Sequence, residues 1–312
     1  MALESLLGEL AAIDRRCEVR SLRLRTLRVG PIDVASIANH VQGITRFDRE
    51  GAAYFAVSVS GPKHGEIWLA RFELKRGDAS VGGAVIASLQ TELAHPGGLQ
   101  ACGDLLAVAC EGDSGWARVE VYDVSDPTQP RLRDTLVLDN SLREGVSQLT
   151  RSKAGWLGFG RLTESEYLLF VGGKRFGEKE GWFYRYRPQA AQRFDYAGPF
   201  AGKVVSTRSG AWGPQSGVAI VNAGAGAPAL VTFGAEGGSG RASLKSEMRC
   251  FSIGLVEHGP TTLSQEPRQA PALYRFASAD LSKLFGANAR WGTTAFLDAS
   301  GRLLTYFTAR NP

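Results

Sequence analysis

The chain has 312 residues, 44% of them hydrophobic and 21% charged, which is the composition of a globular protein with a sizeable core rather than a disordered chain. Its formal net charge of +5 comes from basic residues that alternate with acidic and apolar ones. Because nucleic acid is normally bound by a concentrated basic face, this pattern argues against a nucleic-acid partner. The four cysteines lack the spacing of a zinc site, so we expect buried thiols in a reducing compartment.

The first sixteen residues predict a short amphipathic helix that precedes the main domain, residues 17–312. Glu4 and Glu9 stand where a signal peptide would have a basic start, and apolar residues recur at helical spacing, at Leu3, Leu6, Leu7, Leu10 and Ile13. No apolar run of about eighteen residues, the length of a membrane span, occurs in the sequence. We therefore expect a soluble protein without a transmembrane segment. The cytoplasm is its default location, unless a leader has been removed.

Strand-like segments follow this helix. Residues 21–29, SLRLRTLRV, begin with the alternation of a strand, because Leu22 and Leu24 alternate with Arg23 and Arg25. Further along the chain, 38 glycines lie mostly between short apolar runs. Glycine is favoured in tight turns, so this distribution predicts many short strands joined by turns. The expected fold class is therefore all-β.

Five of these segments can be aligned on a glycine that precedes a strand-like run: Gly43, Gly98, Gly145, Gly217 and Gly292. The first two intervals are 55 and 47 residues, close to the about 40–50 residues of a four-stranded propeller blade. We predict that each segment is the innermost strand of one blade in a single β-propeller. Five blades are expected, and a sixth, concealed in the two longer intervals, is the alternative. Only about twenty residues follow Gly292, so the strand around Leu22 is expected to complete the last blade and close the ring.

One run resembles a known family. Residues 121–127, VYDVSDP, with Pro130 after them, resemble the LVIVD repeat of bacterial β-propellers, in which a strand ends in an Asp-Pro turn before the outer strand. The resemblance covers about twenty residues of one blade. It implies a propeller fold and no particular chemistry, because LVIVD-like propellers do not share one established activity.

The propeller prediction brings polar residues from distant parts of the sequence to one place. Residues that enter the inner strands line the mouth of an axial funnel, and the loops between second and third strands rise on the same face. The inner-strand set is His40, Gln42, His95, Arg143, Glu144, Gln215, Arg290 and Trp291; the loops add Lys63, His64, Glu111, Lys174 and Arg175.

These side chains suggest three kinds of site. His40, His95 and Glu144 have the donor types that hold zinc, iron or manganese, and the same three could perform acid–base catalysis. Alternatively, Arg143, Arg290 and Lys63 would pair with the charge of a small anionic or polar ligand, with Gln42, His64 and Gln215 as polar contacts and Trp291 as a stacking face. Each residue also has a purely structural interpretation, in which histidines bond backbone groups and arginines join blades.

Other function classes are disfavoured by the sequence. A five-bladed glycosidase would place carboxylates at several inner-strand positions, where only Glu144 is expected, and neither a GxSxG motif nor a P-loop is present. The favoured function is binding of a small polar or anionic ligand in the funnel, with metal- or His/Glu-assisted catalysis as an extension. The alternative is a protein-interaction scaffold. A ligand site predicts a deep polar pocket, whereas a scaffold predicts a plugged channel and an exposed apolar rim.

Overall fold

The structure is a computed structural model that describes residues 21–24, 41–72, 80–112, 116–138, 154–175, 178–199, 217–222, 228–236, 245–253, 272–276, 293–297 and 303–307. All regular secondary structure in these residues is β-strand, so the all-β prediction is confirmed. The helix predicted for residues 1–16 lies outside the described part of the chain. Within that part, no helix is long and apolar enough to cross a membrane.

Four of the sheets contain four consecutive antiparallel strands each. The first has β2 (Val41–Arg49), β3 (Ala52–Val59), β4 (Glu66–Phe72) and β5 (Ser80–Gln90), and the second has β6 (His95–Cys102), β7 (Leu105–Glu111), β8 (Ala117–Asp123) and β9 (Arg131–Val137). The third has β10 (Trp156–Arg161), β11 (Tyr167–Arg175), β12 (Glu178–Tyr186) and β13 (Phe194–Pro199). The fourth has β14 (Gly217–Val221), β15 (Ala229–Glu236), β16 (Lys245–Ser252) and β17 (Ala272–Phe276). A fifth sheet pairs β18 (Thr293–Leu297) with β19 (Leu303–Phe307).

Tight turns join neighbouring strands as the sequence indicates. Cys102 pairs with Leu105 across Gly103, whose φ of 61° is the left-handed conformation that glycine adopts without strain. Glu50 and Gly51, between β2 and β3, both have positive φ, as in the type I′ turns that suit the twist of a hairpin. Cys102 and Cys110 are free thiols; Cys110 is buried and Cys102 is partly exposed.

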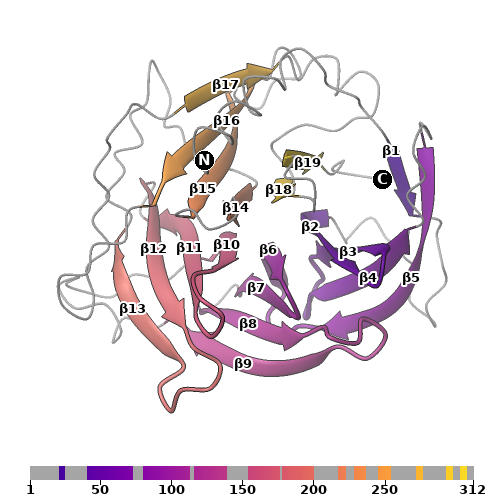
Figure 1. Cartoon of the computed structure of the whole chain (residues 1–312), viewed down its shortest axis with the longest axis horizontal. Helices are drawn as coiled ribbons and strands as arrows, with labels where there is room; N and C mark the ends of the chain where they lie inside the picture. The colour runs from indigo at the N-terminus through magenta and orange to yellow at the C-terminus, as the bar shows by residue number, and fades with distance from the viewer. Residues whose placement is uncertain are drawn as a thin grey trace.

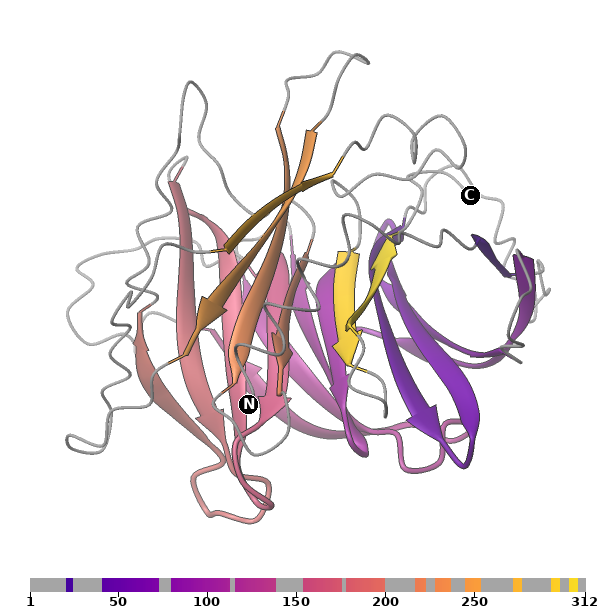
Figure 2. The same ribbon diagram turned by 45° about the horizontal axis from the view of Figure 1, so that its top comes forward.

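The sheets stand around a common centre, with the first strand of each sheet innermost (Figure 1). These inner strands are β2, β6, β10, β14 and β18, and each lies against the next, with β18 also against β2. In the tilted view the sheets rise side by side around this centre (Figure 2). The innermost position predicted for the segments of Gly43, Gly98 and Gly217 therefore agrees with the structure.

Glycines allow the inner strands to touch through their backbones. The Gly98 amide donates a hydrogen bond to the Gly155 carbonyl, 2.9 Å away, from one sheet to the next. A Cβ added to Gly98 would lie 2.6 Å from the backbone nitrogen of Leu157, and one added to Gly43 would lie 2.6 Å from the Gly97 oxygen. A larger residue would push the strands apart, which explains the glycines at positions 43 and 98.

One sequence-based prediction of strand position lies outside the described residues and another is wrong. Gly145, where the third inner strand is predicted, is not described; the third inner strand among the described residues is Trp156–Arg161, preceded by Gly155. The N-terminal strand β1 (Ser21–Leu24) does not pair with the last sheet; it runs parallel to β5, with Leu22 opposite Val81. Alternation of apolar residues predicts a strand but does not specify which sheet edge it joins.

The core lies between successive sheets. Phe159 of β10 stacks on Tyr167 of β11, with ring centroids 5.1 Å apart, among buried side chains of the second and third sheets. Trp182, Tyr184 and Tyr186 are buried, so this face of β12 packs in the core.

Candidate functional site

Two of the predicted mouth residues meet at a buried serine. Gln42 lies near the start of β2, His95 begins β6, and Ser60 directly follows β3. Gln42 Nε2 donates a hydrogen bond to Ser60 Oγ over 2.9 Å, and Ser60 Oγ is 3.2 Å from His95 Nδ1. We call Gln42, Ser60 and His95 the Ser60 cluster. It joins side chains from two neighbouring sheets at the end of the centre where the inner strands begin.

Backbone contacts hold the Ser60 cluster in place. Ser60 is only 2% exposed, and the next residue, Gly61, donates its amide to the carbonyl of Ala94, immediately before His95. The Gly65 amide likewise donates to the Leu93 carbonyl. The loop between β3 and β4 is therefore bonded to the segment that leads into β6, so the separation of Ser60 and His95 is fixed by the fold.

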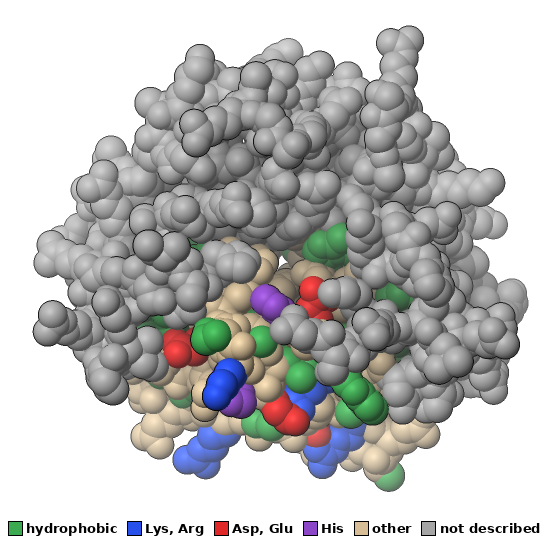
Figure 3. Space-filling model, turned by 180° about the vertical axis from the view of Figure 1, so that it is seen from behind, with side chains coloured by type: hydrophobic (Ala, Val, Ile, Leu, Met, Phe, Trp, Pro, Cys, Tyr) green, Lys and Arg blue, Asp and Glu red, His purple; other side chains and the backbone are tan. Residues whose placement is uncertain are grey.

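Charged residues lie on elements next to the cluster. Glu111, the last residue of β7, lies opposite His95 in the ladder between β6 and β7. Lys63 and His64 are exposed on the loop between β3 and β4, as the sequence predicts for a loop at the mouth. Figure 3, seen from behind Figure 1, shows histidine side chains beside basic and acidic ones on this face. The described residues of the mouth can donate hydrogen bonds and include both basic and acidic side chains.

The other predicted site residues lie outside the described part of the chain: His40, Arg143, Glu144, Gln215, Arg290 and Trp291. Of the three predicted metal ligands, only His95 is described. Within the described residues, no group of three or more His, Cys, Asp and Glu side chains lies close enough together to hold a metal ion. The metal and catalytic assignments of His40, His95 and Glu144 stay predictions.

Sequence reasoning missed a glutamine at the centre of the molecule. Gln100 of β6 is 6% exposed, and its Oε1 accepts the backbone amides of Phe159, at 2.7 Å, and Ile220, at 2.8 Å. Its Nε2 donates to the Ile220 carbonyl over 2.7 Å. One side chain thus links β6, β10 and β14. In the sequence, Gln100 is a single polar residue in the apolar run Leu99–Cys102. That pattern does not show whether the side chain is buried or faces solvent.

A buried polar cluster between the first and second sheets was also missed. Glu120 of β8 is 1% exposed and accepts a hydrogen bond of 2.7 Å from Arg118 Nε and another from the Tyr122 hydroxyl. Arg118 also pairs with Glu92. Burial, and then the charge of Glu120, raises the pKa of Tyr122 and holds the pKa of the Cys110 thiol well above its usual value. Cys110 therefore stays a neutral thiol, which is a poor nucleophile.

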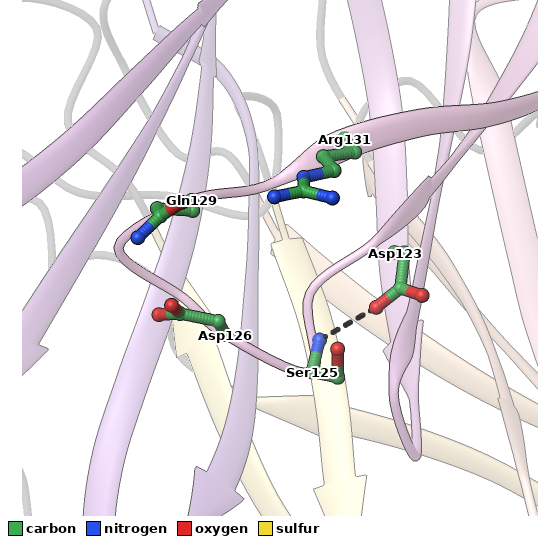
Figure 4. A pocket seen from close by; sticks show the side chains of 5 residues that line it. All are labelled: Asp123, Ser125, Asp126, Gln129 and Arg131. Atoms are coloured by element: carbon green, nitrogen blue, oxygen red, sulfur yellow. Dashed lines mark hydrogen bonds between the residues drawn. The ribbon is translucent and has the colours of Figure 1, made fainter.

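A shallow pocket of about 230 Å³ lies in the turn between β8 and β9, lined by Asp123, Ser125, Asp126, Gln129 and Arg131 (Figure 4). Asp123 accepts the Ser125 amide over 2.9 Å, and Asp126 accepts the Thr128 amide over 2.9 Å. These hydrogen bonds lower the pKa of both carboxyls. Because both carboxylates are used to close the turn, we assign the pocket to local structure. β8 runs parallel to β6, so this turn lies at the end opposite His95.

The comparisons with known proteins bear on the fold alone. No protein-family model and no curated protein matches the chain. Among solved structures, the chain is similar to MPT-4, a mannose phosphorylase from Leishmania mexicana in complex with phosphate ion, with a TM-score of 0.51 and 9% identity. The match covers 98% of this chain and 90% of that chain, so the similarity extends along nearly the whole of both proteins.

Proposed function

We propose that the five sheets are the blades of one β-propeller and that the His95 end of its axis is a funnel that binds a small polar or anionic molecule. The order of contacts among the inner strands, each against the next and β18 against β2, supports five blades. The LVIVD resemblance of residues 121–127 is part of the same proposal. The observation that carries the function is the Ser60 cluster, in which a buried hydroxyl orients donors from two blades.

The chemistry of the cluster favours an oxygen-rich or anionic ligand. The Ser60 hydroxyl accepts from Gln42, and its oxygen lies 3.2 Å from His95 Nδ1. In the tautomer whose Nδ1 accepts the Ser60 proton, Nε2 carries the ring proton and is a donor. Lys63 adds a positive charge on the adjoining loop, and Arg143 and Arg290 are predicted to add two more. The phosphate ion in the structurally similar phosphorylase fits the same ligand class.

Calorimetric titration with inorganic phosphate tests this function. We expect His95→Ala and Gln42→Ala each to weaken phosphate binding about tenfold or more, because a hydrogen bond to a charged group contributes about 1.5–3 kcal/mol. Gln129→Ala is the matched control, since Gln129 is exposed at the opposite end of the sheets. Absence of phosphate binding, or equal binding by all three variants, contradicts the proposal. Elemental analysis of the same samples tests the proposed metal, which would be lost with His95.

A scaffold function is the second candidate, because two observations favour it. The Gln100 side chain of β6 is hydrogen-bonded to β14 across the centre. Leu132 and Val137 are about half exposed on β9, the outer strand of the second sheet. A scaffold would retain its protein partner in His95→Ala and lose it in a Leu132→Asp/Val137→Asp double variant. Co-purification of the partner with each variant separates the two functions.

A further inference from the structure

We propose that Gln100 takes the place of a strand at the centre of the molecule. In this role its amide pairs with the inward edges of β10 and β14, fastens the second, third and fourth sheets together, and closes the centre beneath the Ser60 cluster. The inference rests on the contacts of Gln100 and is independent of the ligand proposed above.

The inner strands create the need for such a residue. β10 and β14 each have a strand partner on one side only within the described sheets, so their other edge faces the centre. In an antiparallel ladder, the N–H and C=O of one residue point to the same side, and alternate residues point to opposite sides. Phe159 and Ile220 therefore direct backbone groups inward. A buried backbone group without a partner costs stability, so these groups require one.

A glutamine amide supplies the matching groups. Its oxygen can accept two hydrogen bonds, and Oε1 accepts from Phe159 and from Ile220. Its nitrogen donates to the carbonyl of the same Ile220, so the side chain reproduces the paired N–H and C=O of a neighbouring strand. Leucine has neither group, and a carboxylate has no donor.

The contact has a consequence for access to the mouth. The centre is occupied by a buried side chain between β6 and β14, which are separated by a whole sheet. Among the described residues, Gln100 therefore blocks the part of the centre between β6, β10 and β14.

Amide hydrogen exchange of the full-length protein tests this role. In Gln100→Leu we expect the amides of Phe159 and Ile220 to exchange at least about tenfold faster than in the wild type, because they lose a buried partner. The amides of Gly158 and Ala219 point to β11 and β15 and keep their protection. Gln129→Leu, at an exposed glutamine, is the control. Unchanged exchange at Phe159 and Ile220 overturns the proposal.

A second variant keeps the test decisive if Gln100→Leu does not fold. In Gln100→Glu, the protonated carboxyl has an oxygen that accepts twice and a hydroxyl that donates to the Ile220 carbonyl, whereas the carboxylate repels that carbonyl. Burial favours the neutral form, so the folded pKa of the new carboxyl lies above its unfolded value. The stabilisation by the neutral carboxyl is therefore fully present at pH values below its pKa in the unfolded state. It is lost as the pH rises through its pKa in the folded state.

We therefore expect the Tm difference between Gln100→Glu and the wild type to shrink on going from about pH 8 to about pH 5. The groups that contact the Gln100 amide are backbone groups, which do not titrate. Arg46 of β2 faces Tyr306, and the other titratable residues of the described inner strands lie at or near strand ends, namely Asp48, Arg49, His95, Cys102 and Arg161. A Tm difference that does not shrink contradicts the assigned role.

Discussion

Single polar side chains in apolar surroundings determine much of this structure. Ser60, Gln100 and Glu120 are all buried; Ser60 and Gln100 each join elements of neighbouring sheets, and Glu120 binds two side chains of its own strand. The sequence predicts Gln42 and His95 at the mouth because both precede a strand beginning at a glycine. It does not predict the three buried residues, since an isolated polar residue in an apolar run has the same pattern whether it faces solvent or a partner.

Glu120→Gln tests the importance of the buried carboxylate. The neutral amide cannot balance the charge of Arg118, whose side chain is 16% exposed and keeps only its exposed partner Glu92. We expect a loss of about 3 kcal/mol in the free energy of unfolding, near the lower end for a broken buried pair. Urea denaturation measures the loss, and Glu164→Gln, at an exposed glutamate, is the control. A loss below about 0.5 kcal/mol, the range of ordinary surface changes, would be inconsistent with this account.

At the scale of the strand, close backbone contact is the feature that sequence captures best. Glycine is recognisable, so the segments of Gly43, Gly98 and Gly217 are correctly predicted as inner strands. The strand that follows Gly155 is not among the predicted segments, and its contact with β6 identifies it as an inner strand. β1 pairs with the free edge strand β5, and the alternation of apolar and basic residues in β1 does not specify that partner.

Gly98→Ala and Gly155→Ala form a matched pair for the contact between inner strands. The methyl group of alanine at position 98 would lie 2.6 Å from the Leu157 nitrogen, whereas nothing lies within 4 Å of a Cβ at position 155. Because forced shifts in a packed region typically cost about 1–3 kcal/mol, we expect Gly98→Ala to lower the thermal midpoint clearly and Gly155→Ala to change it little. Similar midpoints for both variants would show that the strands can separate without cost.

Across the whole molecule, the first and last sheets meet through side chains. Arg46 of β2 donates to the Tyr306 hydroxyl of β19 over 2.8 Å and lies 4.9 Å from the ring centroid of Phe296 in β18. Phe55 of β3 packs edge-on against Tyr306, with ring centroids 5.0 Å apart. The predicted closure by the N-terminal strand is replaced, among the described residues, by these contacts. Sequence could not identify them, because Arg46 and Tyr306 are 260 positions apart.

A double-mutant cycle on Arg46 and Tyr306 measures how strongly the two ends of the chain are coupled. We expect Arg46→Ala to destabilise the protein by about 1–3 kcal/mol, and a coupling of about 1 kcal/mol with Tyr306→Phe, as for a partly buried hydrogen bond. Arg71→Ala, at an exposed arginine of β4, is the control. Additive effects would mean that the hydrogen bond does not connect the two sheets energetically.

The pairing of β1 also has a consequence for the order in which the protein is built. Ser21 pairs with Ser80 and Leu24 with Gly83, so β1, which is translated before β2 to β5, has no partner until the chain has been synthesised beyond residue 83. Contacts between residues distant in sequence form late, because the intervening loop must first be ordered. β2 to β5 can pair with their neighbours as they emerge. The first sheet therefore acquires β1 last, although β1 is translated before the other described strands of that sheet.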